Sequence, residues 1–251
     1  MNDIINVLKG VVLLEDKTYQ SFLTAENVMK RGIYILFVCF LIIALPAAVG
    51  QMFDNIQPFT EERAADFQEQ FFAGYDQMTQ FMPQDEEFQT FIEMFKENFE
   101  YGLQFGVAID ALPRPLPRAA GVFLQTFGGW ISSPFTHLGA WIGYAIWVLL
   151  FAKMTGGLGG VNRFLGLTAL YAVPNLLGFL AFIPYVGGLF SLVGIVWGWV
   201  VYVKAVSVSQ EFSGGKAVLI AILPVVVLFI VILVVTLIFG LSLAAVFGSG
   251  Q

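Results

Sequence analysis

Three long apolar runs between Lys153 and Phe239 constrain this chain more than any other feature of its sequence. The first two cover residues 164–182 and 189–203, and the third begins at Ala217; only short loops rich in glycine, proline or charge separate them. A bilayer core about 30 Å thick needs about 20 apolar residues of helix, whereas a soluble helix shows a polar face every third or fourth residue. These runs show no such face. We therefore expect an integral membrane protein.

The composition supports this class and limits the chemistry that the chain can carry. The sequence is 58% hydrophobic and only 12% charged, which is unusual for a soluble globular protein. Its net charge of −6 argues against a nucleic-acid partner, because binding a polyanion needs clustered Lys and Arg. The single cysteine, Cys39, lies in an apolar run, so this chain alone forms no disulfide framework or thiolate metal site.

The distribution of Lys and Arg predicts the topology. We expect five spans near residues 32–50, 133–152, 164–182, 188–207 and 217–240, with Lys30 and Arg31 directly before the first. Eight of the 12 basic residues then fall on one side, which the positive-inside rule makes cytoplasmic. The amino end would be cytoplasmic and the carboxyl end outside. Small residues at 44–48 suggest a cleaved signal peptide as the alternative, but the long, acidic segment before them favours an uncleaved first span.

Residues 1–31 form a lead-in with a short amphipathic stripe. Ile4, Leu8, Val11 and Val12 share one side of a helix, with polar residues between them. Two interpretations stay open: a helix that lies flat on the membrane surface, and a short helix packed against the protein's own loops.

Residues 51–118 differ sharply from their surroundings. Thirteen of the 18 acidic residues lie between Asp54 and Asp110. Thr60 with Glu61 and Glu62 is typical of a helix start. Two aromatic stripes at spacings of three and four predict an antiparallel helical hairpin outside the membrane: Phe67, Phe71, Tyr75, Met78 and Phe81, then Phe88, Phe91, Phe95 and Phe99. The carboxylates occupy the opposite face without any histidine, so we interpret them as a solvated face, not a metal site.

The segment after the hairpin predicts a linker, a short helix and the second span. Three prolines in residues 112–118 favour an extended linker. Residues 119–127 are expected to form one short helix that ends at Gly128 and Gly129. In the second span, Gly139 and Gly143 permit close helix packing. His137, the only histidine, is interpreted as a hydrogen-bonded residue near the outer end, in preference to a proton relay.

The later spans hold the candidate intramembrane site. Pro174 predicts a kink, because it gives no N–H to the carbonyl of Leu170. Asn175 is expected to bond a neighbouring helix; the alternative, a solute site at a broken helix, would require Pro224 as a second break. A small-residue stripe on the fourth span predicts close packing against another helix: Gly187, Ser191, Gly194 and Gly198. The glycines of 156–160 lack the residues of a phosphate-binding loop and are expected to form a flexible turn.

Several segments together resemble the bacterial branch of the YIP (Ypt-interacting protein) family. They are Gly156-Gly-Leu-Gly-Gly-Val-Asn-Arg-Phe164, Gly166 through Tyr171 to Pro174, Ile183-Pro-Tyr-Val-Gly187, Gly215-Lys-Ala217 and the lead-in Leu8-Lys-Gly-Val-Val-Leu-Leu14 with Thr18-Tyr19. The resemblance covers roughly residues 7–22 and 133–240 and leaves out the hairpin. It implies five spans and the same topology as the charge bias. Eukaryotic members contact Rab-type GTPases in membrane traffic, but their Asp-Leu-Tyr-Gly-Pro motif has no clear counterpart here.

These observations predict an all-α, polytopic membrane helix bundle of five spans with an extramembrane helical hairpin between the first and second. The expected parts are the lead-in (1–31), the first span (32–50), the hairpin and linker (51–118) and a four-span YIP-like domain (119–251). No catalytic, cofactor-binding or metal-ligating constellation is visible, so we expect no enzyme and no cofactor. We expect a scaffold or adaptor in a bacterial inner membrane that contacts the lipid bilayer and a protein partner through the hairpin or the cytoplasmic loops. A carrier of lipids or apolar small molecules is the alternative.

Overall fold

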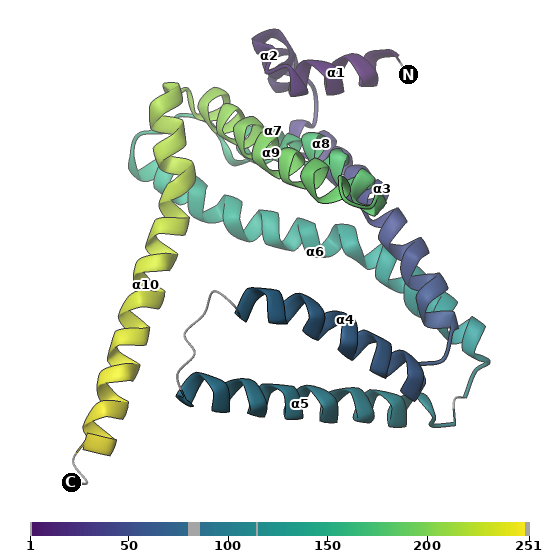
Figure 1. Ribbon diagram of the computed structural model, residues 1–251. Helices are drawn as coiled ribbons and strands as arrows, with labels where there is room; N and C mark the ends of the chain where they lie inside the picture. The colour runs from purple at the N-terminus through teal and green to yellow at the C-terminus, as the bar shows by residue number, and fades with distance from the viewer. Residues whose placement is uncertain (1, 80–85, 114, 249–251) are drawn as a thin grey trace. The chain divides into compact units, whose positions relative to one another are not determined.

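The computed structural model describes residues 2–79, 86–113 and 115–248, with side-chain surroundings for 6–73, 89–90, 92–113 and 115–238. Within these ranges the regular elements are all helices, joined by loops and turns, and there is no strand. Five helical segments are long and apolar enough to cross a membrane: α3 (Val28–Ile56), α6 (Arg118–Met154), a third span over Val161–Phe182, α9 (Gly187–Gln210) and α10 (Gly214–Gly248) (Figure 1). The predicted all-α bundle of five spans, with a hairpin between the first two, is confirmed.

The chain divides into two compact units. Met1–Ala48 and Gly128–Gln251 form the membrane unit, and Val49–Phe127 form the hairpin unit. In the membrane unit, buried apolar side chains of α3, α6, the third span, α9 and the start of α10 form one core. Beyond its first turns, α10 exposes apolar side chains from Val225 to Ile238, as a lipid-facing helix does.

The third span is not a regular α-helix. It consists of α7 (Val161–Thr168), the 3₁₀ turn η1 (Ala169–Tyr171), α8 (Ala172–Asn175) and the 3₁₀ segment η2 (Leu176–Phe182). We expected one kink at Pro174, but the backbone changes helix type on both sides of that residue. Because proline lacks an N–H, the regular hydrogen-bond pattern is already broken at α8, and 3₁₀ bonds tighten the turns around it.

The first and third spans cross at two glycines that the sequence did not single out. A Cβ added to Gly32 would lie 2.2 Å from the carbonyl oxygen of Gly166. A Cβ added to Gly166 would lie 2.5 Å from Cγ1 of Val28 and 2.6 Å from its carbonyl oxygen. The two backbones are therefore in direct contact, which only glycine permits at these positions.

The lead-in packs on helices of the membrane unit, whereas the second interpretation of its stripe placed it against loops. It forms α1 (Asn2–Val12) and α2 (Asp16–Thr24). Val11 is fully buried, Trp197 of α9 donates to the carbonyl of Val12 at 2.8 Å, and Lys204 pairs with Asp16. Tyr19 is buried and donates to the carbonyl of Val11, and this burial raises the pKa of its phenol. Of the stripe residues whose side chains are described, Val11 is thus covered by the membrane unit, Leu8 is partly buried and Val12 stays exposed.

The second span corrects one prediction. We expected a short helix over 119–127 that ends at Gly128 and Gly129, but α6 runs without interruption from Arg118 to Met154 and also includes Pro134. A glycine inside a helix costs only about 1 kcal/mol relative to alanine, so two glycines do not end a helix that packing supports. A Cβ at either glycine would meet no described atom within 4 Å.

Two helices, α4 (Glu61–Thr79) and α5 (Glu86–Asp110), lie side by side in the hairpin unit (Figure 1). Their phenylalanine rings contact one another. The rings of Phe71 and Phe99 stack with centroids 4.6 Å apart, and Phe67 stacks on Phe99 at 6.1 Å. Phe95 lies 6.3 Å from Phe71. The predicted packing of the two stripes is confirmed for these residues. The side chains of Tyr75, Met78, Phe88 and Phe91, and all of Phe81, lie outside the described part.

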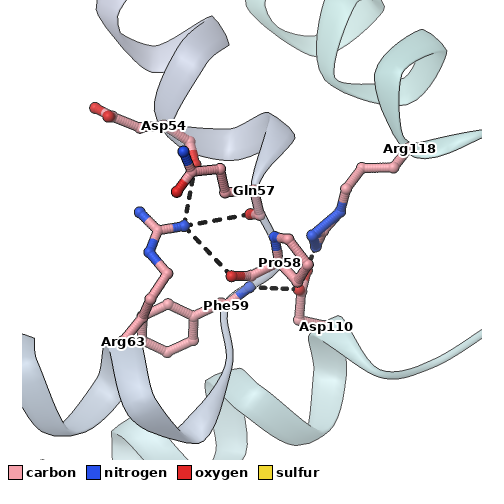
Figure 2. A network of polar contacts seen from close by, with 7 residues as sticks. All are labelled: Asp54, Gln57, Pro58, Phe59, Arg63, Asp110 and Arg118. Carbon is pink, nitrogen blue, oxygen red and sulfur yellow. Dashed lines mark hydrogen bonds and ion pairs between the residues drawn. The ribbon is translucent and has the colours of Figure 1, made fainter.

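A polar network fixes the base of the hairpin (Figure 2). Asp110 accepts the backbone N–H of Phe59 at 2.8 Å and forms an ion pair with Arg118. Arg63 donates to the carbonyl oxygens of Asp54, Gln57 and Pro58 at 3.2–3.3 Å. These carbonyls belong to the last turn of α3 and the loop after it, where helical partners are missing. Both ends of the hairpin are thereby tied to the segments that enter and leave it.

Candidate functional site

A large cavity lies between four of the spans in the membrane unit. Its volume is about 760 Å³, within the range of sites that hold small molecules. Its wall is mostly apolar or aromatic, and none of the lining residues is Asp, Glu, Lys or Arg. The lining comes from α3 (Phe40, Ile43, Ala44, Ala47), α6 (Ser133, His137, Ala140, Trp141, Tyr144), the third span (Tyr171, Asn175, Gly178, Ala181) and α9 (Ser191, Ile195, Gly198, Trp199, Tyr202).

Two polar side chains on this wall bond to their own helices. His137 Nδ1 lies 2.9 Å from the carbonyl oxygen of Ser133, so this nitrogen carries the proton, and the ring stacks on Phe40 with centroids 3.9 Å apart. Asn175 Nδ2 donates to the carbonyl of Tyr171 at 2.8 Å. We had expected Asn175 to bond a neighbouring helix, but within the described part of the chain its side chain bonds only to its own irregular span, where the carbonyl of Tyr171 is a nearer acceptor. Its side-chain oxygen accepts no hydrogen bond within the described part of the chain.

An aromatic cluster closes one part of the cavity. The ring of Tyr202 lies 5.6 Å from that of Tyr144 and 6.3 Å from that of Tyr171. Tyr144 donates to the carbonyl of Ala221 in α10, whereas the hydroxyl of Tyr202 and the indole N–H of Trp141 have no partner in the described part. Both side chains are at most 5% exposed. A buried donor without a partner costs roughly 1–3 kcal/mol. Both polar atoms are covered by the packing around them, so they offer no donor to a molecule inside the cavity.

The predicted packing glycines fall into two groups. Those on α9 lie against the third span: a Cβ at Gly187 would be 2.3 Å from Ala181 O, at Gly194 2.9 Å from Pro174 O, and at Gly198 2.6 Å from Asn175 Nδ2. Ser191 of the same stripe lines the cavity. On α6, a Cβ at Gly139 or Gly143 would meet no described atom within 4 Å.

The two prolines of the candidate intramembrane site are not brought together. Pro174 is buried, and only its neighbour Asn175 lines the large cavity. Pro224 lines a separate cavity of about 340 Å³ between α6 and α10. Tyr144 lines both cavities. Asn175 and Pro224 therefore line two separate cavities and do not share one solute site.

Sequence reasoning missed the aromatic wall. Ser133, His137, Trp141 and Tyr144 recur on α6 at spacings of four, four and three, and so share one face of the helix. Within an apolar span such a stripe looks like ordinary core packing. The stripe becomes a cavity wall because the side chains opposite it, on α3 and η2, are small. A single sequence does not show that these helices face each other.

This chain matches no protein-family model, no curated protein and no solved structure. The YIP resemblance therefore stays a prediction. The fold and the cavity define the class: an integral membrane protein with five helices able to span the bilayer and a separate helical hairpin.

Proposed function

We propose that this protein is a non-enzymatic membrane scaffold or adaptor of the YIP type, in a bacterial inner membrane, that binds a protein partner through its hairpin unit. One observation carries the proposal: the phenylalanine stripes of the hairpin unit pack on each other, yet the unit leaves large apolar side chains exposed outside these stripes. Tyr101 is 63% and Phe105 68% exposed on α5. These residues lie four apart and so share one helix face, and exposed apolar patches of this kind mark binding surfaces.

Capture from native membranes tests the scaffold. The tagged full chain is expected to retain a reproducible partner that the double variant Tyr101→Ser and Phe105→Ser loses. Asn175→Leu, which alters the cavity and not the hairpin, should keep it. A partner that all three chains retain equally, or none beyond those that an unrelated membrane protein retains, would contradict binding through the hairpin.

A second candidate function is favoured by the cavity: binding or carriage of lipids or other apolar molecules. Paths for charged solutes are lined by ionisable side chains, and the cavity wall has no Asp, Glu, Lys or Arg. An apolar molecule needs none of these. It would fill a space of about 760 Å³ between aromatic and small side chains.

Reconstitution into liposomes tests carriage. Lipid scrambling and solute flux are measured for the parent and for Asn175→Leu, which removes an amide from the cavity wall. Asn98→Leu is the matched control, because Asn98 of α5 makes the same side-chain bond to the carbonyl four residues back, at 2.7 Å, outside the membrane unit. Flux that Asn175→Leu abolishes and Asn98→Leu preserves supports a carrier. Absence of flux in the parent rejects carriage and leaves the scaffold.

The orientation is a separate prediction. In a Cys39→Ala background, a cysteine at Leu158 is expected to react only from the cytoplasmic side and one at Glu97 only from the outside. Leu158 is 72% exposed in the loop before α7, and Glu97 is exposed on α5. Gly157 is unsuitable for labelling, because a Cβ there would lie 2.5 Å from Oε1 of Gln210. Reaction of both cysteines with an impermeant maleimide from one side would refute the topology.

A further inference from the structure

A second, polar pocket lies where the first and third spans begin. Its volume is about 360 Å³, and the side chains around it include Lys30 and Asn27 at the start of α3 and Arg163 and Asn162 at the start of α7. All four residues are exposed. Neither Lys30 nor Arg163 forms an ion pair within the described part of the chain. Two positively charged residues and two amide residues thus line one pocket, and no Asp or Glu lines it.

The glycine crossing explains why these residues meet. Gly32 and Gly166 lie one turn inside their respective helices, and their backbones touch. Both helices begin on the same side of this contact, because the pocket is lined by residues from the first turn of each. The spans are therefore parallel here, and their amino ends lie together.

Parallel amino ends add to the positive potential of the pocket. The first N–H groups of a helix have no partner inside the helix, and the helix dipole places partial positive charge at that end. At α7 the N-cap residue is Gly160, which supplies no side-chain bond to these N–H groups. Glu26, the nearest carboxylate along the chain, precedes Asn27 but does not line the pocket. The acid Asp16 of α2 is paired with Lys204.

We propose that this pocket binds the phosphate of an anionic lipid headgroup. Lys30 and Arg163 supply charge-assisted hydrogen bonds, and the two helix ends and the amides complete the donor set. A lipid is favoured over a soluble phosphate because the pocket lies at the step from Lys30 and Arg31 to the apolar run of α3, which is where a membrane surface begins. Leu23 and Met29 add apolar lining beside the donors. Basic pockets at this level of a membrane bundle suit anionic headgroups. The site requires neither carriage nor a protein partner.

Lipid retention by the purified full chain tests this inference. In detergent, phosphatidylglycerol and phosphatidylcholine with identical acyl chains are titrated, and bound lipid is counted by native mass spectrometry. The parent is expected to prefer phosphatidylglycerol. Lys30→Gln with Arg163→Gln should bind it roughly thirtyfold more weakly. Arg31→Gln with Lys17→Gln removes the same charge from residues outside the pocket and should retain the preference.

A second variant separates binding from folding. Asn162→Asp places a carboxylate in the first turn of α7, where it stabilises the helix, yet it repels a phosphate. It is expected to melt no lower than the parent and to lose the preference for phosphatidylglycerol. Equal retention by the parent, the double glutamine variant and Asn162→Asp would overturn the proposal. So would displacement of the lipid by millimolar inorganic phosphate, because the ligand would then be a soluble anion.

Discussion

Replacing Gly32 by alanine is expected to destabilise the membrane unit by about 3 kcal/mol, at the upper end of the usual cost of overpacking. The added Cβ would lie 2.2 Å from the carbonyl oxygen of Gly166, and a backbone atom cannot move aside as a flexible side chain can. The first and third spans must therefore separate. In a thermal melt of the purified protein, the midpoint should fall by about 6–12 °C.

The matched control is Gly143→Ala, because a Cβ at that position meets no described atom within 4 Å. Alanine is a better helix former than glycine, so this variant should melt at or slightly above the parent temperature. If the two alanine variants melt alike, the first and third spans are not in backbone contact.

Phe99→Ala is expected to open the hairpin unit. This ring is only partly exposed and contacts Phe67, Phe71, Phe72 and Phe95. Removal of a buried phenylalanine costs about 3–5 kcal/mol, and because Phe99 is only partly buried we expect about 2–3 kcal/mol. Where cleavage follows the population of the open form, proteolysis within residues 61–110 should become about 30- to 150-fold faster.

Phe105→Ala is the control for the hairpin, because this ring lies on the same helix and is 68% exposed. Its proteolysis rate should match that of the parent. Equal acceleration in both variants would mean that α5 as a whole is labile, and no change in either would show that the phenylalanines do not hold the hairpin closed.

Patterns within single segments were enough to predict most of the fold. Continuous apolar runs predicted the spans, because a membrane helix is apolar over its whole surface. The three-and-four spacing of phenylalanines predicted the hairpin, because an amphipathic helix buries only one face. Thr60 likewise marked the start of α4, and it accepts the N–H of Arg63 at 3.4 Å. These features depend on neighbours close in the sequence.

Features that depend on two distant helices were missed. Gly32 and Gly166 carry no local signal, since each is an isolated glycine in an apolar segment, and only their contact gives them a role. The same holds for the cavity, where Ala44 and Gly178 leave space opposite the aromatic face of α6. Gly128 and Gly129 led to a wrong prediction, because they suggested a helix end. The helix continues through them, since the free-energy cost of glycine inside a helix is small and the segments on both sides are helical.

The mixed helix type of the third span changes how far it reaches. Three residues in η1 and seven in η2 rise about 2.0 Å each instead of about 1.5 Å, so the 22-residue span extends about 38 Å, against about 33 Å for an α-helix of equal length. We expect a thicker bilayer to favour the 3₁₀ form and a thinner one to favour conversion of η2 to α-helix, which would rotate Gly178 and Ala181 relative to the cavity. A change in hydrophobic thickness would then change the shape of the cavity.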